Sequence, residues 1–260
     1  MRPEGSTMRH MPDKRLSRQE IKELLYRRRY AIPNAVTVGN MFCGFLAILY
    51  ASSERFDKAV IAILIAILLD GLDGRVARKL NATSKFGIEF DSFSDLVSFG
   101  IAPAVLTYHW AFNDLANEFG VAIAFFFALC SASRLARFNI SAENLKSFTG
   151  LPTPGAAAFV VSVVNTSLHP QPSYVTVVVG ATMMLAVGYL MVSTIDFFSI
   201  KQFKLSGFRL RGRLLLGLVI ALTWYNFTIG FLLIASAYVL SGPYLRVRAN
   251  LPTWLGGRAV

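Results

Sequence analysis

Long apolar stretches constrain the fold of this chain more than any other feature. Stretches of about 20 apolar residues recur from residue 35 onward, and each can cross the roughly 30 Å hydrocarbon core of a bilayer as one α-helix. The stretches are continuous and do not alternate with polar residues, which excludes a membrane β-barrel. Hydrophobic residues make up 54% of the chain and the mean hydropathy is +0.51. We therefore expect an all-α, polytopic membrane helix bundle.

The pattern predicts about eight transmembrane helices. The segment TWYNF at 223–227 interrupts the last long apolar stretch. We interpret it as a tight hairpin, and one long tilted helix is the alternative that would give seven spans. The expected spans are 35–53, 57–80, 92–112, 116–138, 154–169, 173–193, 212–224 and 227–244.

The distribution of lysine and arginine predicts the topology. These residues are concentrated in 1–34, 71–90, 134–153, 194–213 and the C-terminal tail, and only Arg55 and Lys58 fall on the other side. Because cytoplasmic loops are enriched in basic residues, both termini are expected in the cytoplasm. The same bias explains the net charge of +11 without a nucleic-acid partner.

The N-terminal segment is polar and basic. Ser17 and Glu20 form a capping-box pattern, and Ile21, Leu24 and Leu25 share one helical face. This pattern predicts an interfacial amphipathic helix on anionic headgroups, with a solvated basic tail as an equal alternative. The expected organisation is a basic segment at 1–33, a transmembrane core at 34–201, a basic loop and hairpin at 202–244, and a tail at 245–260.

Four aspartates lie where two expected spans meet the cytoplasmic surface. Asp70 and Asp73 are three residues apart, and Asp91 and Asp95 are four apart, so each pair shares a helical face. Two antiparallel helices would bring the pairs together, and the carboxylates would repel one another. A divalent cation would offset that repulsion, and an oxygen-only ligand set suggests Mg²⁺, Mn²⁺ or Ca²⁺.

Gly74, Ala77 and Arg78 continue the face set by Asp70 and Asp73. Small residues allow a ligand to approach the backbone, and arginine suits a phosphate oxygen. These groups together suggest transfer of a phosphoryl group at the membrane surface. Two metals could stabilise the phosphoryl group and the leaving phosphate, or one carboxylate could take a proton from an attacking hydroxyl. An ion site in a transporter is a second possibility. A loop in which the acids only form ion pairs is a third, the partners being Arg75, Arg78, Lys79 and Lys85.

The aspartates also fit a known signature. The pattern D-G-x2-A-R-x8-G-x3-D-x3-D spans Asp73 to Asp95, passes through Gly87, and is preceded by Asp70. It resembles the signature of the CDP-alcohol phosphotransferases at every position and spacing. The resemblance implies that Asp70, Asp73 and Asp91 bind the metals, and that Asp95 is the general base and possibly a further metal ligand. It also implies that Gly74, Ala77, Arg78 and Gly87 form the CDP site.

Further stretches are similar to the bacterial and archaeal membrane-embedded phosphatidylserine synthases. They include IPNAVTVGNMFCGFLA (32–47), SASRLARFN (131–139) and FTGLPTPGAAA (148–158), and the similarity runs to about residue 201. Gly155 departs from the alanine expected after Thr-Pro. The resemblance implies transfer of a phosphatidyl group from CDP-diacylglycerol to L-serine with release of CMP, in a homodimer of a prokaryotic cytoplasmic membrane.

The carboxylate of a serine acceptor needs a cationic side chain beside it. Arg134 and Arg137 lie at the cytoplasmic end of the fourth expected span, and headgroup contact is the alternative for both. The predicted serine site is Arg134, Arg137, Asn139, Thr153 and Ser193.

Three further polar residues are candidates for contact with the substrates. Thr37 and Asn40 are predicted to belong to the CDP-substrate pocket, with helix packing as the rival interpretation. Lys201 is a candidate for a lipid phosphate or for interfacial anchoring. Glycerol 3-phosphate, inositol phosphate or choline as acceptor, an ether lipid as donor, and a divalent-cation transporter remain the alternatives.

Overall fold

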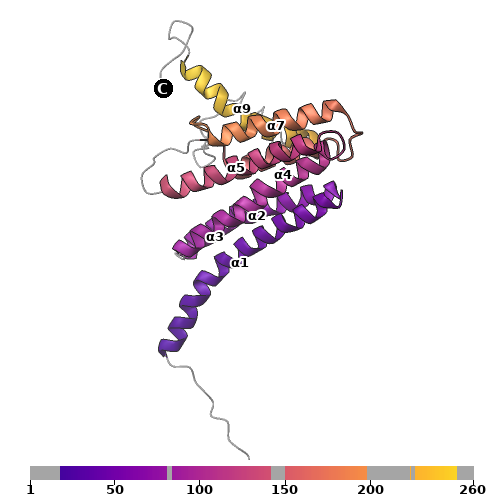
Figure 1. Ribbon diagram of the computed structural model, residues 1–260. Helices are drawn as coiled ribbons and strands as arrows, with labels where there is room; N and C mark the ends of the chain where they lie inside the picture. Colours follow the sequence, from indigo (N-terminus) through magenta and orange to yellow (C-terminus); the bar gives the residue numbers. More distant parts are fainter. Residues whose placement is uncertain (1–17, 81–83, 142–149, 198–222, 224–225, 251–260) are drawn as a thin grey trace, which may run out of the picture.

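The described part of the chain is a bundle of helices (Figure 1). The computed structural model describes residues 18–80, 84–141, 150–197, 223 and 226–250. These residues form no β-strand, which confirms the expected all-α class. The helices are α1 (Arg18–Ser52), α2 (Phe56–Leu80), α3 (Lys85–Asp95), η1 (Leu96–Ile101), α4 (Ala102–Thr107), η2 (Tyr108–Phe112), α5 (Asn117–Ser141), α6 (Thr153–Val164), α7 (Tyr174–Val192) and α9 (Phe227–Asn250).

Among the described residues, four helices are long and apolar enough to cross a membrane. They contain the segments Pro33–Ser52, Asn117–Ile140, Tyr174–Val192 and Phe227–Val247. Helix α2 matches the expected second span in length, although it carries the charged residues of the signature. The expected count of eight is not confirmed, because 212–224 lies almost wholly outside the described residues.

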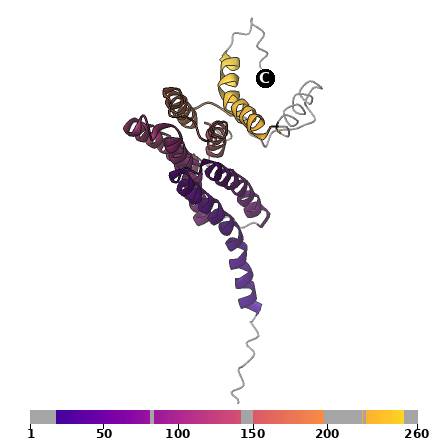
Figure 2. The same ribbon diagram turned by 90° about the vertical axis from the view of Figure 1, so that its right-hand side faces the viewer.

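Helix α1 begins within the basic segment and continues into the first span. It runs for 35 residues with Pro33 inside it, so the helix expected near the N-terminus is continuous with the membrane helix. Its N-terminal part projects away from the bundle (Figure 2). Contact of this part with headgroups stays a prediction.

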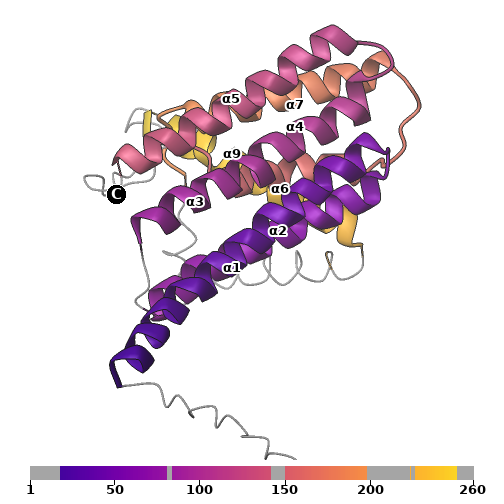
Figure 3. The same ribbon diagram turned by 60° about the horizontal axis from the view of Figure 1, so that its bottom comes forward.

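Residues 85–112 form a continuous helical run that lies in the middle of the bundle. It consists of α3, η1, α4 and η2, and its two η segments are π-helical. The run packs against α1 on one side and α5 on the other, while α1 packs mainly on α2 and α5 on α7 (Figure 3). Phe99, Phe112 and Phe127 are fully buried between these layers.

Helix α9 packs on α6, and the two run in opposite directions. Nδ2 of Asn165, just after α6, donates a hydrogen bond to Oγ1 of Thr228 over 3.3 Å. At the other end, Nη1 of Arg246 donates to Oγ1 of Thr194 over 3.4 Å. The middle of α9 lies beside the first turn of α6, where Tyr238 is next to Gly155, and both residues line the cavity that carries the aspartates.

Candidate active site

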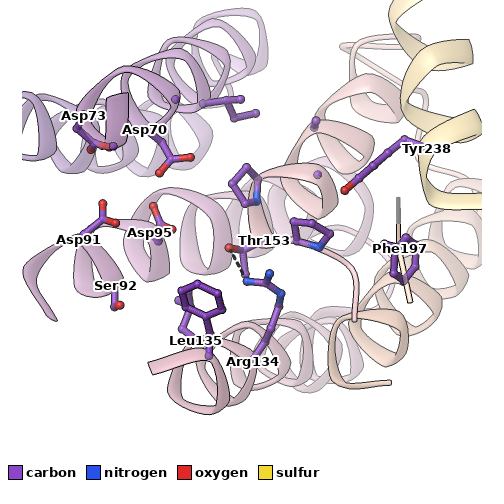
Figure 4. A pocket seen from close by; sticks show the side chains of 18 of the residues that line it. Asp70, Asp73, Asp91, Ser92, Asp95, Arg134, Leu135, Thr153, Phe197 and Tyr238 are labelled. Carbon is purple, nitrogen blue, oxygen red and sulfur yellow. Dashed lines mark hydrogen bonds between the residues drawn. The ribbon is translucent and has the colours of Figure 1, made fainter. Parts of the chain in front are cut away.

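The second and third expected spans bring their aspartates together. Asp70 lies in α2, while Asp91 and Asp95 lie in α3, and one oxygen from each falls within 4.8 Å of the others. Asp73 lies one turn after Asp70 on α2 and faces the same cavity (Figure 4). Both α2 and α3 pack on α1, and this shared support brings the two pairs of aspartates together.

The chemistry of the cluster fits a divalent cation. Burial, followed by the charges of Asp73 and Asp70, raises the pKa of the Asp91 carboxyl to about 7. Oδ1 of Asp91 is buried and has no hydrogen-bond partner among the described residues. Clustered carboxylate oxygens of this kind are the ligands preferred by hard divalent cations.

The aspartates do not form ion pairs with any side chain that the structure describes. Arg75, Lys79 and Lys85 were the expected partners in the loop interpretation, and no such pair is formed within this part of the chain. The side chain of Arg78 lies outside the described set. The loop interpretation is therefore not supported for Arg75, Lys79 and Lys85.

Helix α1 supports the cluster from behind. Oγ1 of Thr37 donates a hydrogen bond to Oδ2 of Asp73 over 3.3 Å, and Nδ2 of Asn40 donates to Oδ1 of Asp95 over 3.4 Å. Both α1 side chains are buried, and neither lines the cavity. Thr37 and Asn40 thus orient the carboxylates in this structure, and direct contact with CDP stays a prediction.

Two more hydrogen bonds fix α1 against the helix that carries Asp95. Oγ of Ser94 donates to the carbonyl oxygen of Thr37 over 3.1 Å, and Oγ of Ser98 donates to that of Asn40 over 3.0 Å. All four residues are buried. The register of α1 against α3 and η1 is therefore set by polar contacts next to the site.

A cavity of about 710 Å³ opens beside the aspartates. Helices α2 and α3 form its acidic side, and α5, α6 and α9 form the opposite side. Its lining includes Arg134, Thr153, Phe197 and Tyr238 (Figure 4). This volume lies within the range of small-molecule sites in proteins.

Arg134 and Thr153, both predicted for the serine site, meet at this cavity. Nη1 of Arg134 lies 3.5 Å from Oγ1 of Thr153. Nε of Arg134 is buried and has no hydrogen-bond partner among the described residues. Arg134 and Asp95 line the same cavity, from α5 and α3.

The other predicted serine residues lie outside the cavity lining. Arg137 donates from Nη1 to the carbonyl oxygen of Val192 over 3.0 Å and from Nη2 to that of Ser193 over 3.2 Å. Oγ of Ser193 in turn donates to the carbonyl oxygen of Leu190 over 2.8 Å. These contacts hold the end of α7, where carbonyl groups need donors. An acceptor role for Arg137 and Ser193 stays a prediction.

Asn139 joins α5 to α3. Its Nδ2 donates to Oγ of Ser92 over 3.0 Å and to Oε2 of Glu89 over 3.2 Å. Ser92 lines the cavity and Asn139 does not. The structure thus gives Asn139 a helix-bridging contact one residue from Asp91.

The predicted CDP residues are described to different extents. Gly74 lines the cavity. Ala77 and Arg78 follow on α2, but their side chains lie outside the described set. Gly87 lies in the first turn of α3, where its backbone N–H donates to Oγ of the capping residue Ser84 over 2.9 Å. Lys201 lies outside the described residues.

Tyr238 and Gly155 are among the lining residues that the sequence did not place in the site. Tyr238 lies in the middle of an apolar helix, and its position gives no local sign of a site. Gly155, on α6, lies against the ring of Tyr238. The glycine in place of the expected alanine was the only signal of this contact.

Comparison with known proteins agrees with the signature. The family model for CDP-alcohol phosphatidyltransferase matches residues 30–241. The chain belongs to this family. The match includes every residue of the acidic cluster and of the cavity lining.

Several curated relatives of the family share this core. A CDP-diacylglycerol–serine O-phosphatidyltransferase of Helicobacter pylori is 42% identical over 180 residues, which cover 67% of this chain and 75% of the relative. One of Bacillus subtilis is 39% identical over 171 residues, covering 64% and 89%. An archaetidylserine synthase of Methanothermobacter thermautotrophicus is 37% identical over 169 residues, covering 64% and 69%. The family is one of divalent-metal-dependent transferases, and the carboxylate cluster fits that requirement.

Proposed function

We propose that this protein transfers a phosphatidyl group from CDP-diacylglycerol to the hydroxyl of L-serine and releases CMP. The observation that carries the proposal is one cavity with aspartates on one side and the guanidinium of Arg134 on the other. A phosphorylated donor and an amino-acid acceptor need these two kinds of group together. The names of the curated relatives support serine as the acceptor.

The metal site is assigned to the aspartates. Asp70, Asp73 and Asp91 would hold Mg²⁺ or Mn²⁺, with Asp95 as a further ligand, and Ca²⁺ has the same preference for oxygen. Two bound ions would supply charge stabilisation for the transferring phosphoryl group and for the leaving phosphate. Gly74, Ala77, Arg78 and Gly87 would bind the CDP portion.

Asp95 is the proposed general base. Its carboxylate would take the proton of the serine hydroxyl, and the serine oxygen would form a bond to the lipid-side phosphorus. The bond from that phosphorus to the bridging oxygen would break, and CMP would leave. Arg134 and Thr153 would hold the serine so that its hydroxyl points at Asp95.

The membrane arrangement completes the proposal. The site and both termini would lie on the cytoplasmic side of a prokaryotic membrane, following the charge bias of the loops. The acyl chains of the donor would enter sideways between helices, and Lys201 would contact a lipid phosphate. A homodimer, implied by the family, is part of the same proposal.

CMP release by the purified protein tests the function. The protein would be given CDP-diacylglycerol and Mn²⁺ or Mg²⁺, with L-serine, glycerol 3-phosphate, inositol phosphate and choline offered in parallel. We expect release with L-serine alone, and none with EDTA. Release with another acceptor would overturn the serine assignment and keep the transfer chemistry.

The identity of the donor lipid and the transporter alternative are tested in separate experiments. Because one relative is an archaetidylserine synthase, an ether-linked CDP-lipid should be tested as the second donor. Absence of release with every acceptor and both donors, in protein with a cooperative melting transition, would contradict the transferase proposal. Cation flux into proteoliposomes would then test the transporter alternative.

A further inference from the structure

Tyr238 is held in a fixed place at the edge of the cavity. A Cβ atom built on Gly155 of α6 would lie 2.6 Å from Cε1 of Tyr238, so only glycine leaves room for the ring. On the other side, the rings of Phe197 and Tyr238 lie 6.3 Å apart between centroids. A Cβ atom on Gly242 would lie 2.5 Å from the Phe197 ring. The tyrosine ring is therefore packed between α6 and Phe197.

The hydroxyl group of Tyr238 faces the cavity. In Figure 4 the side chain reaches from α9 toward the side that carries Thr153 and the aspartates. Among the described residues the hydroxyl has no hydrogen-bond partner. A polar group fixed at a cavity wall without a protein partner is available to a ligand.

Arg134 supplies a second donor on the same side of the cavity. Arg134 on α5 and Tyr238 on α9 both line the cavity, and the buried Nε of Arg134 has no partner among the described residues. A phenol and a guanidinium both donate hydrogen bonds. Together they form a donor pair opposite the acidic cluster, and such a pair suits a carboxylate.

We infer that Tyr238 and Arg134 together bind the carboxylate of the amino-acid acceptor. With the carboxylate on this donor pair, the acceptor's hydroxyl would extend toward Asp95 across the cavity. Tyr238 thereby distinguishes an amino acid from an alcohol without a carboxylate. The inference rests on the proposed function and adds a residue from the C-terminal helix to the acceptor site.

Removal of one hydroxyl group tests this role. Tyr238→Phe keeps the ring between Gly155 and Phe197 and deletes the donor. We expect the KM for L-serine to rise about 10-fold, the effect of losing a hydrogen bond to a charged group. The KM for CDP-diacylglycerol should stay within about twofold, because the donor lipid does not use this hydroxyl.

L-serinamide separates a binding role from a structural one. Its amide lacks the carboxylate charge, so Tyr238→Phe should alter its KM much less and reduce the preference of the enzyme for serine over serinamide. Gly155→Ala displaces the ring and should reproduce the selective rise in the serine KM. Tyr244→Phe is the matched control, because Tyr244 lies on the same helix and is 64% exposed.

The KM values of Tyr238→Phe for serine and serinamide decide whether Tyr238 binds the carboxylate. A selective rise in the serine KM, with unchanged melting temperature, supports the inference. A serine KM within about twofold of the wild type in Tyr238→Phe, or an equal rise for serinamide, overturns it while the proposed function stands. A wild-type protein that transfers to another acceptor and not to serine overturns the proposed function itself.

Discussion

Nδ2 of Asn40 donates a hydrogen bond to Oδ1 of Asp95 over 3.4 Å, from α1 to α3. Both residues are buried, and Asp95 lines the cavity whereas Asn40 does not. The amide therefore restrains one oxygen of the proposed base from the side away from the substrate. This contact links the first span to the chemistry of the second and third.

Replacement of Asn40 by alanine should slow turnover more than it weakens binding. Loss of a hydrogen bond to a charged group leaves Asp95 less well oriented, so we expect kcat to fall about 10-fold. The KM values for serine and CDP-diacylglycerol should change little. Steady-state CMP release measures both quantities, with Asn113→Ala, at an exposed position, as the control. An unchanged kcat would remove Asn40 from the catalytic arrangement.

Asp95→Asn should nearly abolish turnover. A positioned general base contributes about 10²- to 10⁴-fold to the rate, and asparagine cannot accept the proton of the serine hydroxyl. Binding of the CDP-lipid, measured by competition at equilibrium, should largely persist. Asp114→Asn is the control, because Asp114 is an exposed carboxylate outside the cavity. Near wild-type turnover in Asp95→Asn would assign the base to another residue.

Asp91→Asn should shift the requirement for metal. Loss of a residue that only supports a metal ligand already weakens metal affinity by about 10-fold or more. Loss of a direct ligand such as Asp91 should therefore weaken it by at least about 10-fold. Titration of CMP release with Mg²⁺ or Mn²⁺ gives the half-maximal concentration, and Mn²⁺ binding followed by electron paramagnetic resonance gives affinity without turnover. Glu89→Gln, at an exposed carboxylate outside the cluster, should leave both unchanged. Identical titrations for Asp91→Asn and the wild type would remove Asp91 from the metal site.

Arg134 and Arg137 should respond differently to alanine. Arg134 lines the cavity, so Arg134→Ala should raise the serine KM more than the KM for CDP-diacylglycerol. Arg137 holds carbonyl oxygens of Val192 and Ser193, so Arg137→Ala should lower the melting temperature by roughly 5 °C.

The two arginine variants together test the assignment of the acceptor site. Kinetics with both substrates and thermal melts in the same detergent give the comparison. A selective rise in the serine KM for Arg137→Ala, at unchanged stability, would move the acceptor site toward the end of α7.

Gly44 should not accept a side chain. A Cβ atom there would lie 2.7 Å from Cα of Ser98, which is backbone that cannot rotate away. Gly44→Ala should destabilise the protein by about 1–3 kcal/mol through overpacking, seen as a lower melting temperature. Gly71→Ala is the matched control, since its Cβ would meet nothing within 4 Å. Equal stability of the two variants would show that α1 and η1 separate without penalty.

The sequence alone determined the class of the fold and the acidic half of the site. Hydrophobic stretches long enough to span a bilayer must become helices, because backbone groups in lipid have no other partner. The helical period then places Asp70 with Asp73 and Asp91 with Asp95 on shared faces. Both inferences depend on residues near one another in the chain, so local physics was sufficient.

Tertiary packing decided what surrounds those aspartates. Thr37 and Asn40 are 36 and 55 residues from their partners Asp73 and Asp95, and only the packing of α1 behind α2 and α3 makes them supports of the cluster. Arg134 lines the cavity and Arg137 does not, because Arg137 donates to the carbonyl oxygens of Val192 and Ser193, at the end of the α7 helix that packs beside α5. Tyr238 reaches the site because α9 packs on Gly155 of α6, and no local pattern encodes a contact between two helices so far apart in the sequence.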